Sequence, residues 1–231
     1  MKIVILCGGK GTRLAEETII KPKPMVKIGN LPIIIHIMEI FKNQGFDEFI
    51  LALGYKGDLI KKYFKDKDYN VKLVDTGKET LTGGRLLKLK NILKDDKFFL
   101  TYGDGVADID LKKLLKFHIK HKKKATVTAV RPPARFGEIY IEQNKVKKFQ
   151  EKPQTSSAWI NGGFFIFEKE IFKYLKNSKT ILEREPLEML SNKGDLMAFK
   201  SLKFWQCMDT MRDKDLLNKI WKNKKAPWKK S

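Results

Sequence analysis

The chain has 231 residues, of which 42% are hydrophobic and 11% aromatic, and this supply of apolar side chains argues against a disordered chain. Its two cysteines, Cys7 and Cys207, are too few and too far apart for a disulfide scaffold or a zinc site. No apolar stretch is long enough to cross a bilayer, and the apolar run at residues 3–7 is too short for a signal peptide. We therefore expect a cytoplasmic protein with no membrane partner.

The net charge of +21, from 48 Lys and Arg against 27 Asp and Glu, is the unusual feature of the composition. Two interpretations are open: a nucleic-acid-binding face, or a solvated lysine-rich surface. The excess is nearly all lysine and is spread along the chain, whereas proteins that bind nucleic acids more often combine arginine with aromatic residues. We therefore favour the solvated surface and expect no nucleic-acid partner. The positive field would still attract phosphorylated substrates.

The first 130 residues alternate between short apolar runs and segments with helical spacing. A run that is apolar throughout is typical of a strand buried on both faces. By this criterion we expect strands at residues 2–7, 47–53, 69–74, 98–102 and 125–130. Helical spacing of apolar residues predicts helices at residues 32–44, 58–64, 82–92 and 110–122. This order predicts a mostly parallel sheet with helices on both faces.

The remaining residues predict additions to that sheet. We expect a hairpin with strands at residues 137–142 and 145–150, and further strands at 160–167 and 196–200. Helices are expected at residues 169–175, 185–192 and 214–222. No repeat or long linker divides the chain. The prediction is one α/β domain, residues 1–231, with a Rossmann-like, mostly parallel mixed sheet flanked by helices and a small β addition.

The first motif is Gly-Gly-Lys-Gly-Thr-Arg-Leu at residues 8–14, directly after the first strand. Glycines let the backbone approach a phosphate closely, and Arg13 can donate two hydrogen bonds to phosphate oxygens. The spacing matches neither the dinucleotide fingerprint nor the P-loop. Taken alone, the motif is equally compatible with an ordinary strand-to-helix turn.

The second motif is Lys-Pro-Lys-Pro-Met at residues 21–25. Its two prolines forbid a regular helix and predict a stiff, extended segment. A rigidly placed Lys23 suits stabilisation of charge on a transferring phosphoryl group. The alternative is a surface loop in a lysine-rich protein.

The third motif places Asp104 between Gly103 and Gly105, just after the strand predicted at residues 98–102. Ligands of open parallel sheets bind beyond the carboxyl ends of the strands. Magnesium takes few carboxylates and keeps waters and phosphate oxygens as its other ligands, so Asp104 is a candidate for such a site. The alternative is a tight turn in which Asp108 or Asp110 caps the next helix.

Taken together, these motifs resemble those of the sugar-1-phosphate nucleotidyltransferases, and the resemblance extends over almost the whole chain. The first loop and Glu-Lys-Pro at residues 151–153 are shared by many members of that family. More specific to its glucose-1-phosphate cytidylyltransferase branch are Thr-Gly-Gly-Arg-Leu at 82–86, Gly-Asp-Gly-Val-Ala-Asp at 103–108 and Trp-Ile-Asn-Gly-Gly at 159–163. The resemblance implies the nucleotide-diphospho-sugar transferase type of fold. Residues 1–130 would form its nucleotide-binding half. Residues 131–231 would form its sugar-phosphate-binding half, with the C-terminal helix.

By that resemblance, the protein transfers a cytidylyl group from CTP to α-D-glucose 1-phosphate, giving CDP-glucose and pyrophosphate. The resemblance implies three catalytic residues, Lys23, Arg13 and Asp104, and a Mg²⁺ ion held by Asp104 and Asp209. It further implies a set of nucleotide-binding residues: Gly8, Gly9, Gly11, Thr12, Arg13, Lys23, Thr82, Gly83 and Gly84. The sugar-phosphate site would comprise Glu151, Lys152, Asn161, Gly162 and Glu183.

Simpler roles are open for several of these residues. Lys152 would be a surface lysine, Asp209 a cap of the last helix, and Asn161 a partner for buried backbone. The resembled cytidylyltransferases also carry a longer segment where this chain has residues 64–71. We expect a homo-oligomer from the same resemblance. The alternative functions are the same chemistry on another sugar 1-phosphate or small phosphorylated acceptor, or a non-catalytic basic protein that binds nucleotides or nucleic acid.

Overall fold

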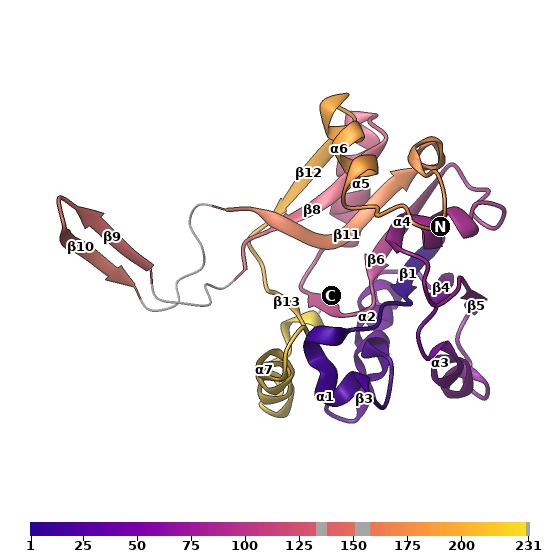
Figure 1. Cartoon of the computed structure of the whole chain (residues 1–231), viewed down its shortest axis with the longest axis horizontal. Helices are drawn as coiled ribbons and strands as arrows, with labels where there is room; N and C mark the ends of the chain where they lie inside the picture. Colours follow the sequence, from indigo (N-terminus) through magenta and orange to yellow (C-terminus); the bar gives the residue numbers. More distant parts are fainter. Residues whose placement is uncertain (133–137, 151–157, 230–231) are drawn as a thin grey trace.

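The computed structural model describes residues 1–132, 138–150 and 158–229. Its centre is a seven-stranded sheet formed by β1 (Ile3–Cys7), β4 (Phe49–Leu53), β5 (Val71–Asp75), β6 (Lys97–Tyr102), β8 (Ala125–Val130), β11 (Ile160–Glu168) and β12 (Leu196–Ser201). The order in space is β12-β8-β11-β6-β1-β4-β5 (Figure 1). Strand β11 runs antiparallel to both of its neighbours, and all other pairs in this sheet are parallel. The predicted mostly parallel mixed sheet is confirmed.

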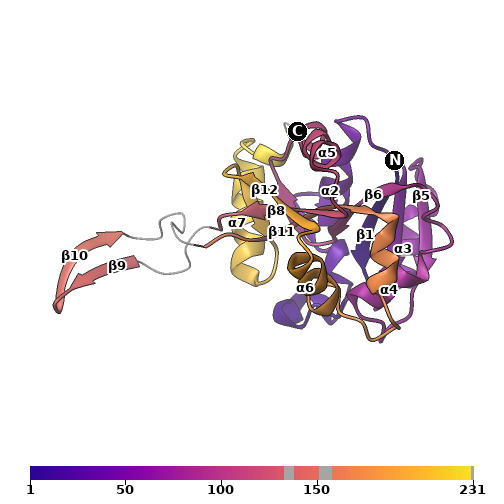
Figure 2. The same ribbon diagram turned by 90° about the horizontal axis from the view of Figure 1, so that it is seen from above.

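Helices cover both faces of the sheet, as the turned view in Figure 2 shows. They are α2 (Ile33–Lys42), α3 (Gly57–Phe64), α4 (Thr82–Lys88), α5 (Leu111–His121), α6 (Glu185–Asn192) and α7 (Met211–Lys222), with a short α1 (Ala15–Thr18). The buried hydrophobic side chains of α2, α3, α5 and α7 belong to one apolar cluster, and those of α4 and α6 belong to the other.

Strand β1 lies between these two clusters, which explains why it is apolar throughout. All five of its residues are buried. Ile3, Ile5 and Cys7 pack into the cluster of α2, whereas Val4 and Leu6 pack into the cluster of α4. Successive side chains of a strand point to opposite faces, so a strand covered on both faces needs an apolar residue at every position.

Several predicted bounds differ from the structure. The helix predicted at residues 82–92 ends at Lys88, and the one predicted at 169–175 is the 3₁₀ helix η3 (Lys169–Tyr174). Helix α7 begins at Met211, three residues before its predicted start, because Thr210 caps it. The Thr210 side chain accepts from the Asp213 backbone and the Asp213 carboxylate accepts from the Thr210 backbone, which is a complete capping box.

Short strand pairs around the sheet were not predicted. Strand β7 (Gly105–Ala107) pairs antiparallel with β13 (Trp205–Cys207), and β2 (Lys27–Ile28) pairs with β3 (Leu31–Pro32). The segment expected to be extended at residues 21–25 contains the 3₁₀ turn η2 (Lys23–Met25). Proline is compatible with the first turn of a helix, because the N–H that it lacks has no partner there.

The predicted hairpin is present as β9 (Glu138–Glu142) and β10 (Lys145–Gln150), which pair antiparallel with each other and lie apart from the sheet in Figure 1. Gln143 and Asn144 join them with φ angles of 46° and 65°, as two-residue hairpin turns require. No helix in the described part of the chain has the length and apolar character to span a membrane.

Candidate active site

A cavity of about 520 Å³ opens where β1 and β6 end, at the carboxyl edge of the sheet. Ligands of open α/β sheets bind at this edge. The first half of the chain contributes these predicted site residues to its lining: Gly8, Gly9, Gly11, Arg13, Lys23, Thr82 and Asp104. The second half contributes Asn161, Gly162, Glu183 and Asp209. Residues more than 200 positions apart in the sequence, such as Gly8 and Asp209, therefore line one cavity.

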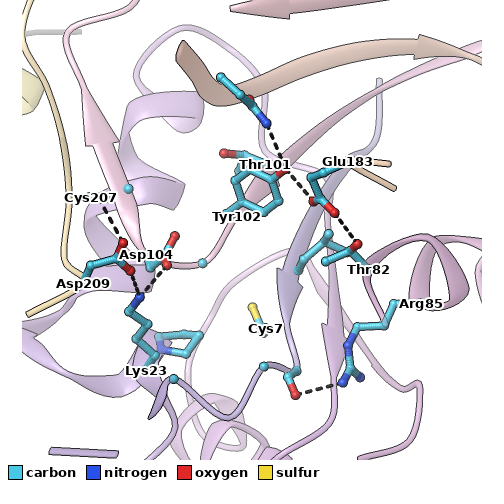
Figure 3. A pocket seen from close by; sticks show the side chains of 18 of the residues that line it. Cys7, Lys23, Thr82, Arg85, Thr101, Tyr102, Asp104, Glu183, Cys207 and Asp209 are labelled. Atoms are coloured by element: carbon cyan, nitrogen blue, oxygen red, sulfur yellow. Dashed lines mark hydrogen bonds and ion pairs between the residues drawn. The ribbon is translucent and has the colours of Figure 1, made fainter. Parts of the chain in front are cut away.

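The buried guanidinium of Arg85 holds the start of the glycine loop. Arg85 is 3% exposed and donates hydrogen bonds to the carbonyl oxygens of Gly8 at 2.8 Å and Leu53 at 2.9 Å (Figure 3). It also donates to Thr76 Oγ1 at 2.7 Å and to the Gly77 carbonyl at 2.8 Å. A Cβ at position 8 would lie 2.1 Å from Arg85 Cζ, so the guanidinium occupies the space that any side chain at Gly8 would need.

The rest of the glycine loop remains open to the cavity. A Cβ at Gly9 would meet no atom within 4 Å. Gly11 has a φ of 67°, in the left-handed region that favours glycine, and begins the 3₁₀ helix η1 (Thr12–Leu14). Thr12 is not among the residues that line the cavity. The glycines of the loop therefore present backbone to a ligand, and Arg13 is the loop residue whose side chain carries a positive charge at the cavity.

Lys23 joins two acidic residues that are far apart in the sequence. Its Nζ lies 2.8 Å from Asp104 Oδ2 and also contacts Asp209 Oδ1 (Figure 3). The second Asp209 oxygen, Oδ2, lies 2.7 Å from Nη1 of Arg13. The suggestion that Asp209 caps the last helix is wrong, because Thr210 takes that position.

Charges within this cluster shift the pKa values of Asp209 and Lys23. Burial by itself would raise the pKa of Asp209, but the hydrogen bond and charge of Lys23, with the charge of Arg13, hold that pKa below its ordinary value. Burial would likewise lower the pKa of Lys23, but Asp104 and Asp209 outweigh it and raise that pKa. The cations of this cluster therefore favour the ionised form of Asp209, and its carboxylates favour the ionised form of Lys23.

A second polar group lies at the other end of the cavity, around Glu183. Tyr102 donates a hydrogen bond to Glu183 Oε1 and Thr82 donates one to Glu183 Oε2, each at 2.6 Å (Figure 3). Asn161 Nδ2 donates to the Tyr102 hydroxyl at 3.1 Å, and Asn161 Oδ1 accepts from the Gly163 N–H at 2.8 Å. The suggestion that Asn161 satisfies backbone therefore holds for one atom of its amide.

Gly83 and Gly84 pack against protein and do not line the cavity. A Cβ at Gly84 would lie 2.4 Å from the carbonyl oxygen of Ser178, and one at Gly83 would lie 2.8 Å from Cγ2 of Thr180. The missing side chains let α4 approach the segment before α6 closely. Of the Thr-Gly-Gly group, only Thr82 lines the cavity.

Two predicted site residues, Glu151 and Lys152, lie outside the described residues. Arg85 and Tyr102 line the cavity but were not singled out from the sequence as site residues. Both stood inside or beside recognised motifs, since Arg85 follows Gly84 and Tyr102 precedes Gly103. Arg85 stands between Gly84 and Leu86, and an arginine with such neighbours was the available signal for the first of these.

The acidic pair fits a magnesium ion. Asp104 and Asp209 approach the same ammonium group, so their oxygens converge on one point. Magnesium in nucleotide sites is bound by one or two carboxylates, with phosphates and waters as the other ligands. In the described part of the chain no three His, Cys, Asp or Glu residues gather as a metal-binding group, so an all-protein cage is not formed there.

Three comparisons relate this fold and site to known proteins. The chain is 48% identical to "Glucose-1-phosphate cytidylyltransferase" of Salmonella typhi over 254 aligned residues, covering 99% of each chain. It is 40% identical to "Probable glucose-1-phosphate cytidylyltransferase" of Bacillus subtilis, again over 99% of each. Both alignments are longer than the 231 residues of this chain, so those relatives have positions that are missing here.

A solved structure shares the fold of this chain. The crystal structure of HddC from Yersinia pseudotuberculosis superposes with a TM-score of 0.77 and 26% identity, covering 95% of this chain and 99% of that one. The model of the family described as "Nucleotidyl transferase" matches residues 2–209, which include every described residue of the predicted site. The chain belongs to the nucleotidyl transferase family.

Proposed function

We propose that this protein transfers the cytidylyl group of CTP to glucose 1-phosphate and releases pyrophosphate. The observation that carries the proposal is the convergence of the glycine loop, Lys23, Asp104 and Asp209 on one cavity. Full-length relatives at 48% identity carry the name of this activity.

In the proposed reaction, a phosphate oxygen of glucose 1-phosphate attacks the α-phosphorus of CTP. The new bond joins that oxygen to the α-phosphorus, the bond from the α-phosphorus to the bridging oxygen breaks, and pyrophosphate leaves with the electron pair. Such a transfer needs positioning and charge neutralisation rather than a covalent intermediate. The open backbone at Gly9 suits the triphosphate, and Arg13 and Lys23 supply positive charge beside it.

The proposed metal ligands are Asp104 and Asp209. A bound Mg²⁺ would neutralise negative charge on the phosphates. This chain's part is to aim both carboxylates at one point, which Lys23 does by contacting both, while Lys23 and Arg13 lower the pKa of Asp209.

The proposed acceptor site lies around Glu183. Asn161, Gly162 and Glu183 line the same cavity as the phosphate-binding residues, and Glu151 and Lys152 remain part of this proposal. Of the nucleotide-binding residues, we propose Gly8, Gly9 and Thr82, which line the cavity, as the contacts of the cytosine base. Gly83 and Gly84 instead serve the packing of α4.

The test is a pyrophosphate-release assay that crosses CTP, UTP, dTTP and GTP with glucose 1-phosphate and mannose 1-phosphate. We expect the highest kcat/KM for CTP with glucose 1-phosphate. Preference for another pair would replace the proposed substrates, and no release from any pair would refute the proposed activity.

The acidic pair is tested by Asp104→Asn. We expect kcat to fall at least about 100-fold, the factor that corresponds to a few kcal/mol of lost transition-state stabilisation. Asp108→Asn is the matched control, because Asp108 lies outside the cavity and pairs with the exposed Lys203 at 2.9 Å. Near-normal turnover of the Asp104 variant would remove this residue from the metal site.

A homo-oligomer is also part of the proposal. Apolar side chains on the hairpin support it, since Ile141 is 62% and Phe149 64% exposed in the single chain. Sedimentation equilibrium of the intact protein decides between a monomer and a larger species.

A further inference from the structure

We propose that Tyr102 is a positioning residue that fixes Glu183 as a hydrogen-bond acceptor for hydroxyl groups of the sugar acceptor. The inference rests on the proposed function and deepens it, because it says how the Glu183 carboxylate is positioned to bind the hydroxyl groups of the acceptor. It starts from four polar side chains that come from distant segments: Thr82, Tyr102, Asn161 and Glu183. They all line the cavity, at the end away from Lys23 and Asp209 (Figure 3).

The hydrogen bonds around Tyr102 can run in only one direction. The Asn161 carbonyl oxygen accepts from the Gly163 N–H at 2.8 Å, so the Asn161 amide group must face Tyr102. That amide donates to the Tyr102 hydroxyl at 3.1 Å. The hydroxyl is then free to use its own proton elsewhere, and it donates that proton to Glu183 Oε1 at 2.6 Å.

The other oxygen of Glu183 is fixed in the same way. The Thr82 hydroxyl accepts from the Leu182 N–H at 2.9 Å and donates to Glu183 Oε2 at 2.6 Å. The two hydroxyls therefore each donate to one oxygen of Glu183, so both oxygens act as hydrogen-bond acceptors. Burial and the charge of Glu183 raise the pKa of the Tyr102 phenol, so Tyr102 keeps the proton that it donates.

Packing fixes the Tyr102 hydroxyl in position. The ring meets Phe165 edge to face, with centroids 6.0 Å apart. A Cβ at Gly163 would lie 2.6 Å from Cδ2 of the ring, so the glycine makes the space that the ring fills. Because Phe165 and Gly163 pack against the ring, its hydroxyl is held in the position from which it donates to Glu183 Oε1.

This arrangement favours a polyhydroxylated ligand. A carboxylate has about four acceptor sites, and Tyr102 and Thr82 use two of those on Glu183. The unused capacity accepts hydrogen bonds, so it selects groups that donate them. Glu183 and Asn161 also line an adjoining cavity of about 340 Å³, whose other walls are mostly apolar and include Trp159 and Leu187. A hexose ring offers both hydroxyl donors and apolar C–H faces.

The test compares Tyr102→Phe with wild type. This variant removes one oxygen and keeps the ring that packs against Phe165. We expect the KM for glucose 1-phosphate to rise about ten-fold, the factor for one lost hydrogen bond to a charged group, while the KM for CTP stays within about two-fold. Tyr63→Phe is the control, because Tyr63 packs against Phe64 outside the cavity.

Acceptors that lack one hydroxyl sharpen the result. Deoxy analogues of glucose 1-phosphate identify the hydroxyl that Glu183 binds. It is the hydroxyl whose removal lowers the kcat/KM of the wild type most. For that analogue, we expect the ratio of kcat/KM for glucose 1-phosphate to kcat/KM for the analogue to be smaller in Tyr102→Phe than in wild type. Glu183→Gln tests the same group, and its effect should not add to that of Tyr102→Phe if the two act as one unit.

The outcomes separate this inference from the proposed function. If wild type turns over CTP and glucose 1-phosphate while Tyr102→Phe is unchanged, or raises both KM values equally, the inference is overturned and the function stands. Calorimetric titration of glucose 1-phosphate into protein holding a non-hydrolysable CTP analogue gives a second readout that needs no turnover. If wild type binds the sugar phosphate there, does not turn over, and Tyr102→Phe binds it more weakly, the function fails and the inference stands.

Discussion

Replacement of Arg85 by methionine tests whether the buried hydrogen bonds that join Arg85 to the glycine loop and to neighbouring segments stabilise the fold. Arg85 is 3% exposed, and its guanidinium donates to five oxygen atoms, three of them in bonds that are fully buried: the Gly8 and Leu53 carbonyls and Thr76 Oγ1. Methionine keeps much of the apolar stem but donates nothing.

The expected loss of stability follows from those three buried bonds. An acceptor left without its buried partner costs about 1–3 kcal/mol. The Gly8 carbonyl keeps a bond from the Tyr55 N–H at 3.1 Å, and the Leu53 carbonyl keeps one from the Thr76 hydroxyl at 2.6 Å. We therefore take the low end for each and expect Arg85→Met to lose about 3 kcal/mol of the free energy of unfolding.

The measurement is urea unfolding followed by tryptophan fluorescence. A loss of about 3 kcal/mol is a large part of the stability of a typical domain, so the midpoint should move clearly. Arg85→Lys should recover part of the loss, because an ammonium still donates to some of these oxygens. Arg212 is exposed, so Arg212→Met controls for the loss of an arginine as such. If Arg85→Met loses less than about 1 kcal/mol of the free energy of unfolding, with an unchanged dependence on urea concentration, the buried hydrogen bonds of Arg85 do not stabilise the fold to the expected extent.

Three further predictions concern stability. Burial lowers the pKa of His118 from 6.5 to about 4, so the unfolded chain binds a proton between these values that the folded protein does not. Stability should therefore fall by about 3 kcal/mol as the pH drops from 6.5 to 4, and His118→Gln should flatten that dependence in urea titrations at each pH. Gly84→Ala should destabilise the protein, because its Cβ would lie 2.4 Å from the Ser178 carbonyl oxygen, whereas Gly9→Ala should leave the midpoint unchanged and weaken CTP binding. Thr210→Ala should cost about 1 kcal/mol through loss of the cap of α7, and an unchanged melting temperature would contradict that role.

Much of the fold and part of the site could be predicted from local sequence. Strand β8 and helix α6 have their predicted bounds. The pattern of apolar residues along a short stretch of sequence is enough to predict a buried strand or an amphipathic helix. Gly8 and Asp104 were expected at one edge because each follows a strand, and parallel strands bring their carboxyl ends together.

Tertiary structure decided which distant groups meet. Lys23 contacts Asp209 across 186 positions, and no local pattern reports such a pairing. Gly84 was expected among the nucleotide-binding residues, yet it packs against Ser178, and the neighbouring Arg85 donates a hydrogen bond to Gly8.

What the sequence determined by itself was the alternation of strands and helices and the position of each motif along them. The periodicity of apolar residues shows which face is covered, but not which element covers it. Partner choice depends on the free energy of the whole packed arrangement, in which Arg85 donates to groups from three segments and Tyr102 bonds side chains from two.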